Sequence, residues 1–249
     1  MKMTMRNVWS TVLGLTLAAC GPVSAPEEAA PEQQEHTLEA GCAALGPALV
    51  DHSCEHVTNG PYASVTASAT DSFSGSSPNI NSTHTYYTVT LPGSGGSYEG
   101  TVKFVPGRTG SWAFLLSNDI PLTVKNSSGT TLTAALTDGL SGSTCALTKA
   151  VVYNLTGSAT YRLTFGSTSV SSVGVEAERV EDFRIFYFQD SDADTYGNTN
   201  VLKLTACTPP AGYVTDDTDC NDANASIHPG ATEIVGNGVD ENCNGSDLN

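Results

Sequence analysis

Alternating carboxylates in the last third of the chain could bind a hard metal ion. The stretch reads Asp190-Ser191-Asp192-Ala193-Asp194-Thr195-Tyr196-Gly197-Asn198. Side chains at alternate positions of a tight loop can point at one centre, where carboxylates would repel one another without a cation. We therefore expect a Ca²⁺ site. Its predicted ligands are the carboxylates of Asp190, Asp192 and Asp194, with the carbonyl of Tyr196 and with Asn198 closing the site.

Two more oxygen-rich stretches follow this loop. The first comprises Asp219, Asn221, Asp222 and Asn224, and the second comprises Asp240, Asn242 and Asn244. We expect them to build one or two further calcium sites. Asn replaces Asp at several positions, so fewer charges compensate the ion and the affinity should be lower than at residues 190–194.

The negative charge of the protein is concentrated around these stretches. Residues 176–249 contain 15 Asp and Glu against 3 Lys and Arg, within a chain of net charge −16. The acidic residues are interleaved with Gly, Pro, Cys and Tyr, whereas a merely solvated acidic tail would be unpatterned and rich in Glu. The same charge disfavours nucleic acid as a partner, because a phosphate backbone would be repelled.

In order and spacing, residues 186–249 closely resemble the MopE-type metal-binding repeat, an acidic, cysteine-containing Ca²⁺ module of bacterial secreted and surface proteins. The residues that carry the resemblance include Asp216-Asp217-Thr218-Asp219-Cys220-Asn221-Asp222, His228-Pro229-Gly230-Ala231-Thr232-Glu233 and Gly236-Asn237-Gly238-Val239-Asp240-Glu241-Asn242-Cys243-Asn244-Gly245. The resemblance implies a loop-rich module, residues 183–249, that is stiffened by calcium.

Two departures separate the segment from related patterns. Val235 stands where many such repeats have a third cysteine, and Thr195 stands where an EF-hand loop has its turn glycine. The aromatic and β-branched run at residues 183–188 predicts a strand where an EF-hand would have a helix. We therefore expect structural calcium, since no helix pair is there for calcium to open.

The N-terminus resembles a bacterial lipoprotein signal. Lys2 and Arg6 precede an apolar run, and Leu17-Ala18-Ala19-Cys20 is similar to a lipobox. We expect a signal peptide at residues 1–19, with an ordinary cleaved signal as the alternative, and a membrane anchor on lipidated Cys20. Residues 20–41 are rich in Pro, Ala, Glu and Gln and predict a disordered, acidic tether. The predicted location is the outer membrane of a Gram-negative bacterium, facing the periplasm or the surface.

The six cysteines beyond Cys20 predict disulfide bonds, because an even number in an exported chain is typical of them. The chain has no Cys-x-x-Cys motif, which disfavours zinc ligation by cysteine. We expect a local bridge between Cys207 and Cys220, and the other pairings stay open.

Residues 42–182 predict an antiparallel β-sandwich, so the whole chain is expected to be mainly β. Short β-rich runs alternate with Gly- and Pro-rich turns. The predicted strands are Tyr62–Ala67, Thr85–Leu91, Gly100–Val105, Ser111–Leu116, Pro121–Lys125, Val151–Leu155 and Tyr161–Phe165. The rhythm from Gly100 to Val124 resembles the jelly-roll modules of secreted bacterial proteins, although a fold-level likeness does not establish function.

The leading hypothesis is a non-enzymatic, calcium-binding lipoprotein, because the chain has no GxSxG, HExxH or Walker A motif. One alternative is a copper-capturing surface protein that uses His56 and His84, by resemblance to methanotroph surface copper proteins of the MopE and CorA type. The Trp-x-His motif of those proteins is missing. Another alternative is a carbohydrate- or protein-binding adhesin that uses exposed aromatics around Trp112 and Tyr86.

Overall fold

The computed structural model describes residues 38–39, 42–69, 71 and 78–247, all within the compact unit of residues 36–249. The predicted signal peptide and Cys20 lie outside the described residues, as does the predicted tether apart from Leu38 and Glu39. None of the described helices is both long enough and apolar enough to cross a membrane.

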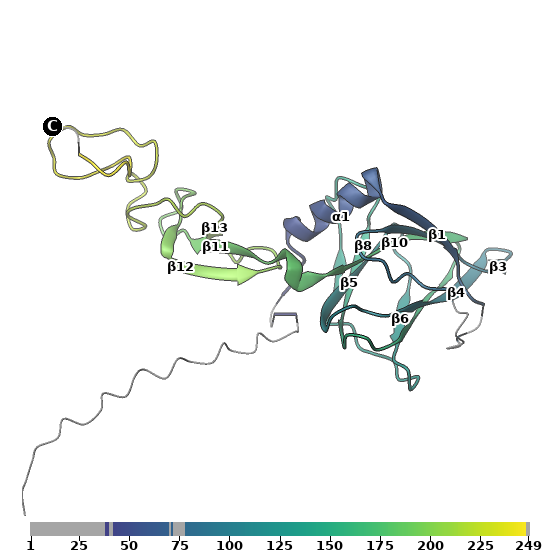
Figure 1. Cartoon of the computed structure of the whole chain (residues 1–249). Helices are drawn as coiled ribbons and strands as arrows, with labels where there is room; N and C mark the ends of the chain where they lie inside the picture. The colour runs from purple at the N-terminus through teal and green to yellow at the C-terminus, as the bar shows by residue number, and fades with distance from the viewer. Residues whose placement is uncertain (1–37, 40–41, 70, 72–77, 248–249) are drawn as a thin grey trace, which may run out of the picture. The chain divides into compact units, whose positions relative to one another are not determined.

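Most of the described residues in helices and strands belong to two sheets, so the prediction of a mainly β fold is confirmed (Figure 1). The first sheet has the order β1 (Tyr62–Thr66), β2 (Tyr86–Thr90), β10 (Ser172–Arg179), β5 (Gly110–Leu116), β8 (Lys149–Leu155) and β7 (Leu136–Gly139). The second has the order β3 (Gly93–Ser94), β4 (Ser97–Phe104), β9 (Tyr161–Thr168) and β6 (Leu122–Lys125). Neighbouring strands are antiparallel, except that β1 runs parallel to β2.

The two sheets enclose one apolar core. Fully buried Phe104, Phe114 and Phe165 come from β4, β5 and β9, so aromatic rings from both sheets meet in it. Trp112 is 3% exposed, lies edge to face with Phe104 at a ring distance of 5.2 Å and donates its indole N–H to the Arg108 carbonyl. The expectation that Trp112 offers an exposed ring to a glycan is therefore wrong. Its ring belongs to the core because aromatic side chains bury large apolar areas.

A helix, α1 (Pro47–Asn59), covers the other face of the six-stranded sheet (Figure 1). Leu49 packs with Leu115 and Val152 in a second apolar cluster between helix and sheet. Every residue of β5 is buried, because one of its faces meets the second sheet and the other meets this cluster. The helix was not predicted. Its buried positions are only Leu49, Ser53 and Cys54, too few to give a clear helical pattern of apolar residues.

A smaller three-stranded sheet follows a 3₁₀ turn at Val180–Phe183. Its order is β12 (Asn198–Thr205), β11 (Ile185–Gln189) and β13 (Tyr213–Val214), and β11 confirms the strand predicted near residues 183–188. Residues 215–247 form turns and loops without a further named strand, which confirms the loop-rich C-terminal module.

The predicted bridge between Cys207 and Cys220 is wrong. The three bonds are Cys42–Cys207, Cys54–Cys145 and Cys220–Cys243. Cys207 lies just beyond β12, where its neighbours pair with residues before α1, because Gly46 N–H donates to Ala206 O and Thr208 N–H donates to Ala44 O. This pairing places Cys207 beside Cys42 and leaves Cys220 to close the C-terminal loops with Cys243.

Candidate metal centres

The side chain of Asp190 holds the loop that follows β11. Its Oδ1 accepts hydrogen bonds from the backbone N–H groups of Ala193 (2.7 Å) and Asp194 (3.2 Å), and its Oδ2 accepts one from Thr195 (3.1 Å). Ala193 and Thr195 adopt left-handed conformations, with φ of 66° and 80°. The turn brings one oxygen each of Asp190, Asp192 and Asp194 within 4.8 Å of one another, as the spacing predicts.

A second loop contributes two more carboxylates. Oxygens of Asp192, Asp219 and Asp222 also lie within 4.8 Å of one another, so Asp192 belongs to both groups. The backbone N–H and the hydroxyl of Ser191 donate to Asp222 at 2.7 and 2.8 Å and tie the loops together. We name this cluster the acidic centre, and its members are Asp190, Asp192, Asp194, Asp219 and Asp222.

Buried Gly197 lets the two loops approach closely. A Cβ at this position would lie 2.8 Å from both the Asp216 carbonyl and the Cβ of Phe188. The Gly197 carbonyl accepts a hydrogen bond from the backbone N–H of Asp219 at 3.3 Å. A larger residue here would separate Asp219 from the first loop, so the glycine serves the geometry of the acidic centre.

Several oxygens of the acidic centre are shielded from solvent and accept no hydrogen bond from a described residue. They are both carboxylate oxygens of Asp192 and the Oδ2 atoms of Asp194 and Asp219. Burying an unpaired charge costs several kcal/mol or more. A cation among these oxygens would supply the missing partner, so the residues fit a metal ion that prefers oxygen ligands.

The pKa of Asp219 also indicates that the acidic centre fits a cation. Burial raises the pKa of Asp219 above its ordinary value, and the charges of Asp194, Asp192 and Asp222 raise it further. A hydrogen bond from the backbone N–H of Asn221 at 2.8 Å acts in the opposite direction. Without a cation, the charged form of this buried carboxyl is therefore less favourable than that of a solvent-exposed aspartate.

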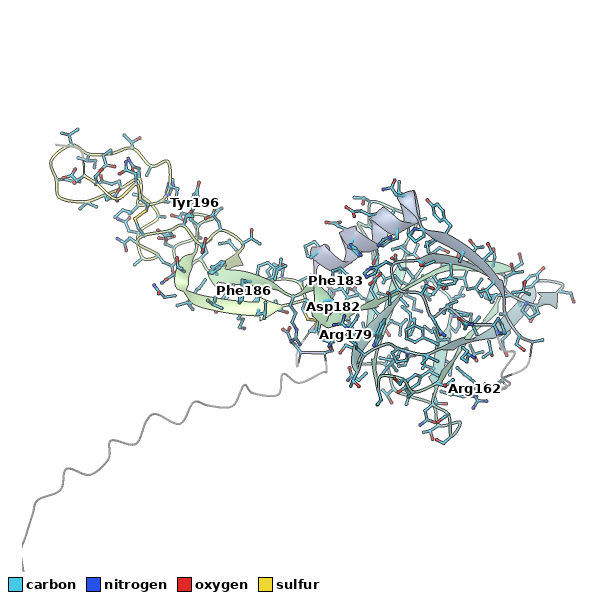
Figure 2. The ribbon with its side chains drawn as sticks, viewed as in Figure 1. Arg162, Arg179, Asp182, Phe183, Phe186 and Tyr196 are labelled. Carbon is cyan, nitrogen blue, oxygen red and sulfur yellow. A yellow bond between two sulfur atoms is a disulfide. The ribbon has the colours of Figure 1, made fainter. Side chains whose placement is uncertain are left out.

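The remaining residues predicted to bind the first two ions lie in the same two stretches of the chain as the acidic residues. The Asn198 amide oxygen accepts hydrogen bonds from the backbone and side chain of Asn200, and the Tyr196 ring stacks on His228 at 5.2 Å. Figure 2 shows Tyr196 in the loop beyond the labelled Phe186 of β11. Asn221 contributes its backbone N–H to Asp219, and the Asn224 amide oxygen accepts a bond from Ser226 N–H.

The third predicted stretch repeats the turn of the first. Asp240 Oδ1 accepts the backbone N–H of Asn244 at 3.0 Å, and its Oδ2 accepts that of Gly245 at 2.7 Å. Cys243 and Gly245 have φ of 54° and 94°, like the third and fifth residues after Asp190. The amide oxygens of Asn242 and Asn244 accept bonds from the backbone N–H groups of Asn244 and Ser246. This stretch therefore has the loop shape with only one of the three alternating carboxylates.

His56 and His84 come together in a separate cluster, with ring centroids 5.5 Å apart. The cluster also contains His52 and Glu178, and one ligand atom of each of the four residues lies within 4.8 Å of the others. Sequence reasoning missed His52 and Glu178. The pair His52 and His56, four residues apart, could have indicated a helical metal-binding pair if α1 had been predicted. We name these four residues the histidine cluster.

Burial affects the proton equilibria around the histidine cluster. Desolvation lowers the pKa of His52, and the neighbouring rings of His56 and His84 lower it further, against the opposing charge of Glu178. Glu176 lies beside the cluster on β10 and is completely buried. Burial and then the charge of Glu178 raise the pKa of Glu176 to about 9. Burial thus disfavours the charged forms of both His52 and Glu176.

Comparison with known proteins identifies one matching segment. Residues 219–247 match the family model Cu-binding MopE, described as "Putative metal-binding motif". No curated protein matches the chain. The match spans the loops that begin at Asp219 and Asp240, but neither the loop at 190–198 nor the histidine cluster. The chain therefore carries a metal-binding motif of the MopE type at residues 219–247.

Proposed function

We propose that the chain is a non-enzymatic, calcium-binding protein of the bacterial cell envelope, in which Ca²⁺ at the acidic centre stabilises the C-terminal module. The observation that carries the proposal is the set of buried carboxylate oxygens of Asp192, Asp194 and Asp219 that accept no hydrogen bond from a described residue. The MopE-type motif supports it, because that motif contains Asp219 and Asp222.

The donor atoms of the acidic centre favour calcium over copper. All five side chains offer hard carboxylate oxygens, and Ca²⁺ takes six to eight such ligands in flexible geometry. Cys220 and Cys243, the nearest sulfur atoms to Asp219, are bonded to each other and offer no thiolate. Mg²⁺ fits less well, since it usually keeps several waters and uses one or two carboxylates.

A structural role for calcium follows from how little apolar surface the module buries. Among described residues 215–247, Ile227 is the one buried apolar side chain. One such residue cannot offset the entropy of ordering more than thirty residues, which costs about 1–2 kcal/mol per residue for the backbone alone. Metal coordination and the Cys220–Cys243 bond supply the constraints that a hydrophobic core would otherwise provide.

The proposal includes a lipid anchor at Cys20 and a place in the outer membrane, facing the periplasm or the surface. The basic, apolar and small-residue order of residues 2–20 supports it. Three disulfides are in keeping with an oxidising compartment. Cells that express the chain are labelled with a fatty-acid analogue, and incorporation is expected to disappear in Cys20→Ala. Absence of label from the unaltered protein would rule the anchor out.

Calorimetric titration of the purified protein with Ca²⁺ tests the calcium site. Asp192→Asn and Asp219→Asn are each expected to weaken binding at least about tenfold, because each removes one formal charge from a site of hard oxygens. Asp217→Asn is the matched control, since Asp217 lies in the same module but outside the acidic centre. Calcium affinity that is unchanged in both ligand variants, or lost equally in the control, would contradict the proposal.

A further inference from the structure

The histidine cluster begins with two rings on one side of α1. His52 and His56 are separated by one helical turn, so their side chains neighbour each other along the helix. The ring centroids lie 4.6 Å apart, and the two Nε2 atoms lie 3.1 Å apart. Cys54, between them in sequence, ties the helix to Cys145. His52 also contacts Phe183 at a ring distance of 4.9 Å, near the labelled Asp182 and Arg179 in Figure 2.

The sheet beneath the helix presents carboxyl groups where apolar side chains would be expected. Val173, Val175 and Ala177 of β10 face the core between the sheets, so Glu176 and Glu178 lie on the opposite face, toward α1. Glu176 is 0% exposed and Glu178 is 1% exposed. Buried carboxylates are normally paired with a cation or bound to a metal ion. Glu176 Oε1 lies 4.0 Å from His56 Nε2, which places the nearest ring of the cluster above it.

His84 closes the cluster from the turn before β2. Its Nδ1 lies 3.1 Å from Glu178 Oε1, and its backbone N–H donates to the same oxygen at 3.0 Å. The residue has a φ of 53°, a left-handed conformation that is uncommon outside glycine. This backbone geometry directs the ring to the helix, where Nδ1 lies 3.0 Å from His52 Nε2.

The short contacts that join His56, His52, His84 and Glu178 cannot all be hydrogen bonds at once. The Gly60 carbonyl only accepts, so His56 Nδ1, 3.0 Å away, carries a proton, and in the neutral ring Nε2 has a lone pair. That lone pair faces His52 Nε2, which also faces His84 Nδ1. If His52 Nε2–H donates to His56 and His84 Nδ1–H donates to the Glu178 carboxylate, the 3.0 Å contact between His52 Nε2 and His84 Nδ1 joins two donors and has no acceptor. A cation between the rings would satisfy the lone pairs together.

The spacing of the donors matches that of metal ligands. In a tetrahedral site with Zn–N distances of about 2.0–2.1 Å, ligand atoms lie about 3.3 Å apart. The two short nitrogen pairs in the cluster are 3.0 and 3.1 Å apart, and the Glu178 oxygen is 3.1 Å from His84 Nδ1. The bond from His56 Nδ1 to the Gly60 carbonyl is the kind of outer contact that orients a metal-binding imidazole.

We propose that His52, His56, His84 and Glu178 bind a divalent transition-metal ion, Zn²⁺ or Cu²⁺. Three imidazoles and one carboxylate suit both ions and differ from the all-oxygen acidic centre, so the two sites select different metals. Four protein ligands complete a tetrahedral shell, which is typical of storage or structural sites rather than catalytic ones. The His84 side chain is 53% exposed and gives the ion a route from solvent.

Titration of the purified protein with Zn²⁺ and, separately, Cu²⁺ tests the site, with Ca²⁺ kept saturating so that carboxylate sites are filled. One equivalent of at least one ion is expected to bind. His84→Ala and Glu178→Gln should each weaken binding by about 100-fold or more. Loss of a residue that only orients a metal ligand weakens binding by about 10- to 100-fold, so loss of a ligand itself should weaken it at least as much. His228→Ala is the control, because His228 lies in the C-terminal module and outside the cluster.

Further measurements identify which ion is bound and show whether each variant is folded. If Cu²⁺ binds, its electron paramagnetic resonance spectrum should show coupling to imidazole nitrogens that changes in His52→Ala and His56→Ala but not in His228→Ala. Circular dichroism and Ca²⁺ affinity confirm that each variant is folded. Failure of both ions to bind the unaltered protein would overturn the proposal, as would undiminished binding in folded His84→Ala and Glu178→Gln.

Discussion

Thr195 and Gly245 occupy the same position in two loops with the same turn. Each lies five residues after an aspartate, Asp190 or Asp240, and donates its backbone N–H to the Oδ2 atom of that aspartate. Their φ values are 80° and 94°. Glycine adopts this conformation at little cost, whereas a β-branched residue is strained in it. The first loop therefore keeps three carboxylates on a strained turn, and the second keeps the relaxed turn with fewer charges.

Thr195→Gly should stabilise the first loop. Removing the steric strain of the left-handed conformation should stabilise the folded state by about 1–2 kcal/mol. The greater conformational freedom of glycine in the unfolded chain offsets about 0.5–1 kcal/mol of this gain. We expect a net gain of up to about 1 kcal/mol in the free energy of unfolding, measured by denaturant titration with chelator present. Gly245→Thr is the converse change and should destabilise. A loss of stability in Thr195→Gly would show that its side chain has another role.

Removal of calcium should loosen the C-terminal module and leave the two main sheets intact. The acidic centre would then hold buried, unpaired carboxylates in a segment with little apolar core, so local opening becomes easy. Limited proteolysis with and without chelator is the measurement. Cleavage is expected within residues 215–247 under chelation only, while residues 78–179 stay protected. Equal resistance in both conditions would mean that calcium does not hold the module together.

The sequence predicted the strands better than the site. Every predicted strand of the middle domain is present. Alternating β-branched residues between Gly- and Pro-rich turns favour a strand through local geometry alone, so the sequence pattern is enough to predict it. The strand β10 was missed, although its acidic and apolar residues alternate as in a half-buried strand. Such alternation alone would place Glu176 and Glu178 in solvent. They lie instead beneath α1. A local pattern does not show that a helix distant in sequence covers that face of the strand.

The candidate metal ligands likewise divide into those that local spacing predicts and those that only tertiary packing brings together. Asp190, Asp192 and Asp194 were found from spacing because one loop holds all three. The contact of that loop with Asp219 and Asp222 depends on close approach at Gly197, which spacing cannot reveal. The histidine cluster joins residues from α1, a turn and β10, so its assembly depends on tertiary packing.

The stability of the protein should fall at alkaline pH through Tyr153. Burial raises the pKa of Tyr153 above its ordinary value, and its hydroxyl donates to the Leu122 carbonyl at 3.1 Å. Above about pH 10 the unfolded chain loses this proton while the folded chain keeps it, so stability decreases as pH rises, by at most about 1.4 kcal/mol per pH unit.

Tyr153→Phe tests this dependence. At pH 7 the variant should lose about 1 kcal/mol with its hydrogen bond. Between pH 10 and 11 its free energy of unfolding should fall less steeply than that of the unaltered protein. Tyr62→Phe is the control, because Tyr62 is 60% exposed. Denaturant titrations at each pH provide the comparison, and equal slopes for the Tyr153 variant and the unaltered protein would contradict the prediction.

Loss of the Cys54–Cys145 bond should affect the histidine cluster more than the acidic centre. The bond joins α1 to the segment before β8 across 91 residues, so its removal costs about 2–4 kcal/mol. In Cys54→Ser/Cys145→Ser, α1 should hold His52 and His56 less firmly over Glu178, and the affinity for Zn²⁺ or Cu²⁺ should fall. Ca²⁺ affinity should stay unchanged, because the acidic centre lies beyond β11.

Cys220→Ser/Cys243→Ser is the matched comparison and should show the reverse pattern, since that bond closes the loops that carry Asp219 and Asp240. Parallel calorimetric titrations of the two variants with each ion decide the matter, and equal losses of both ions in both variants would show that the two sites are not held independently.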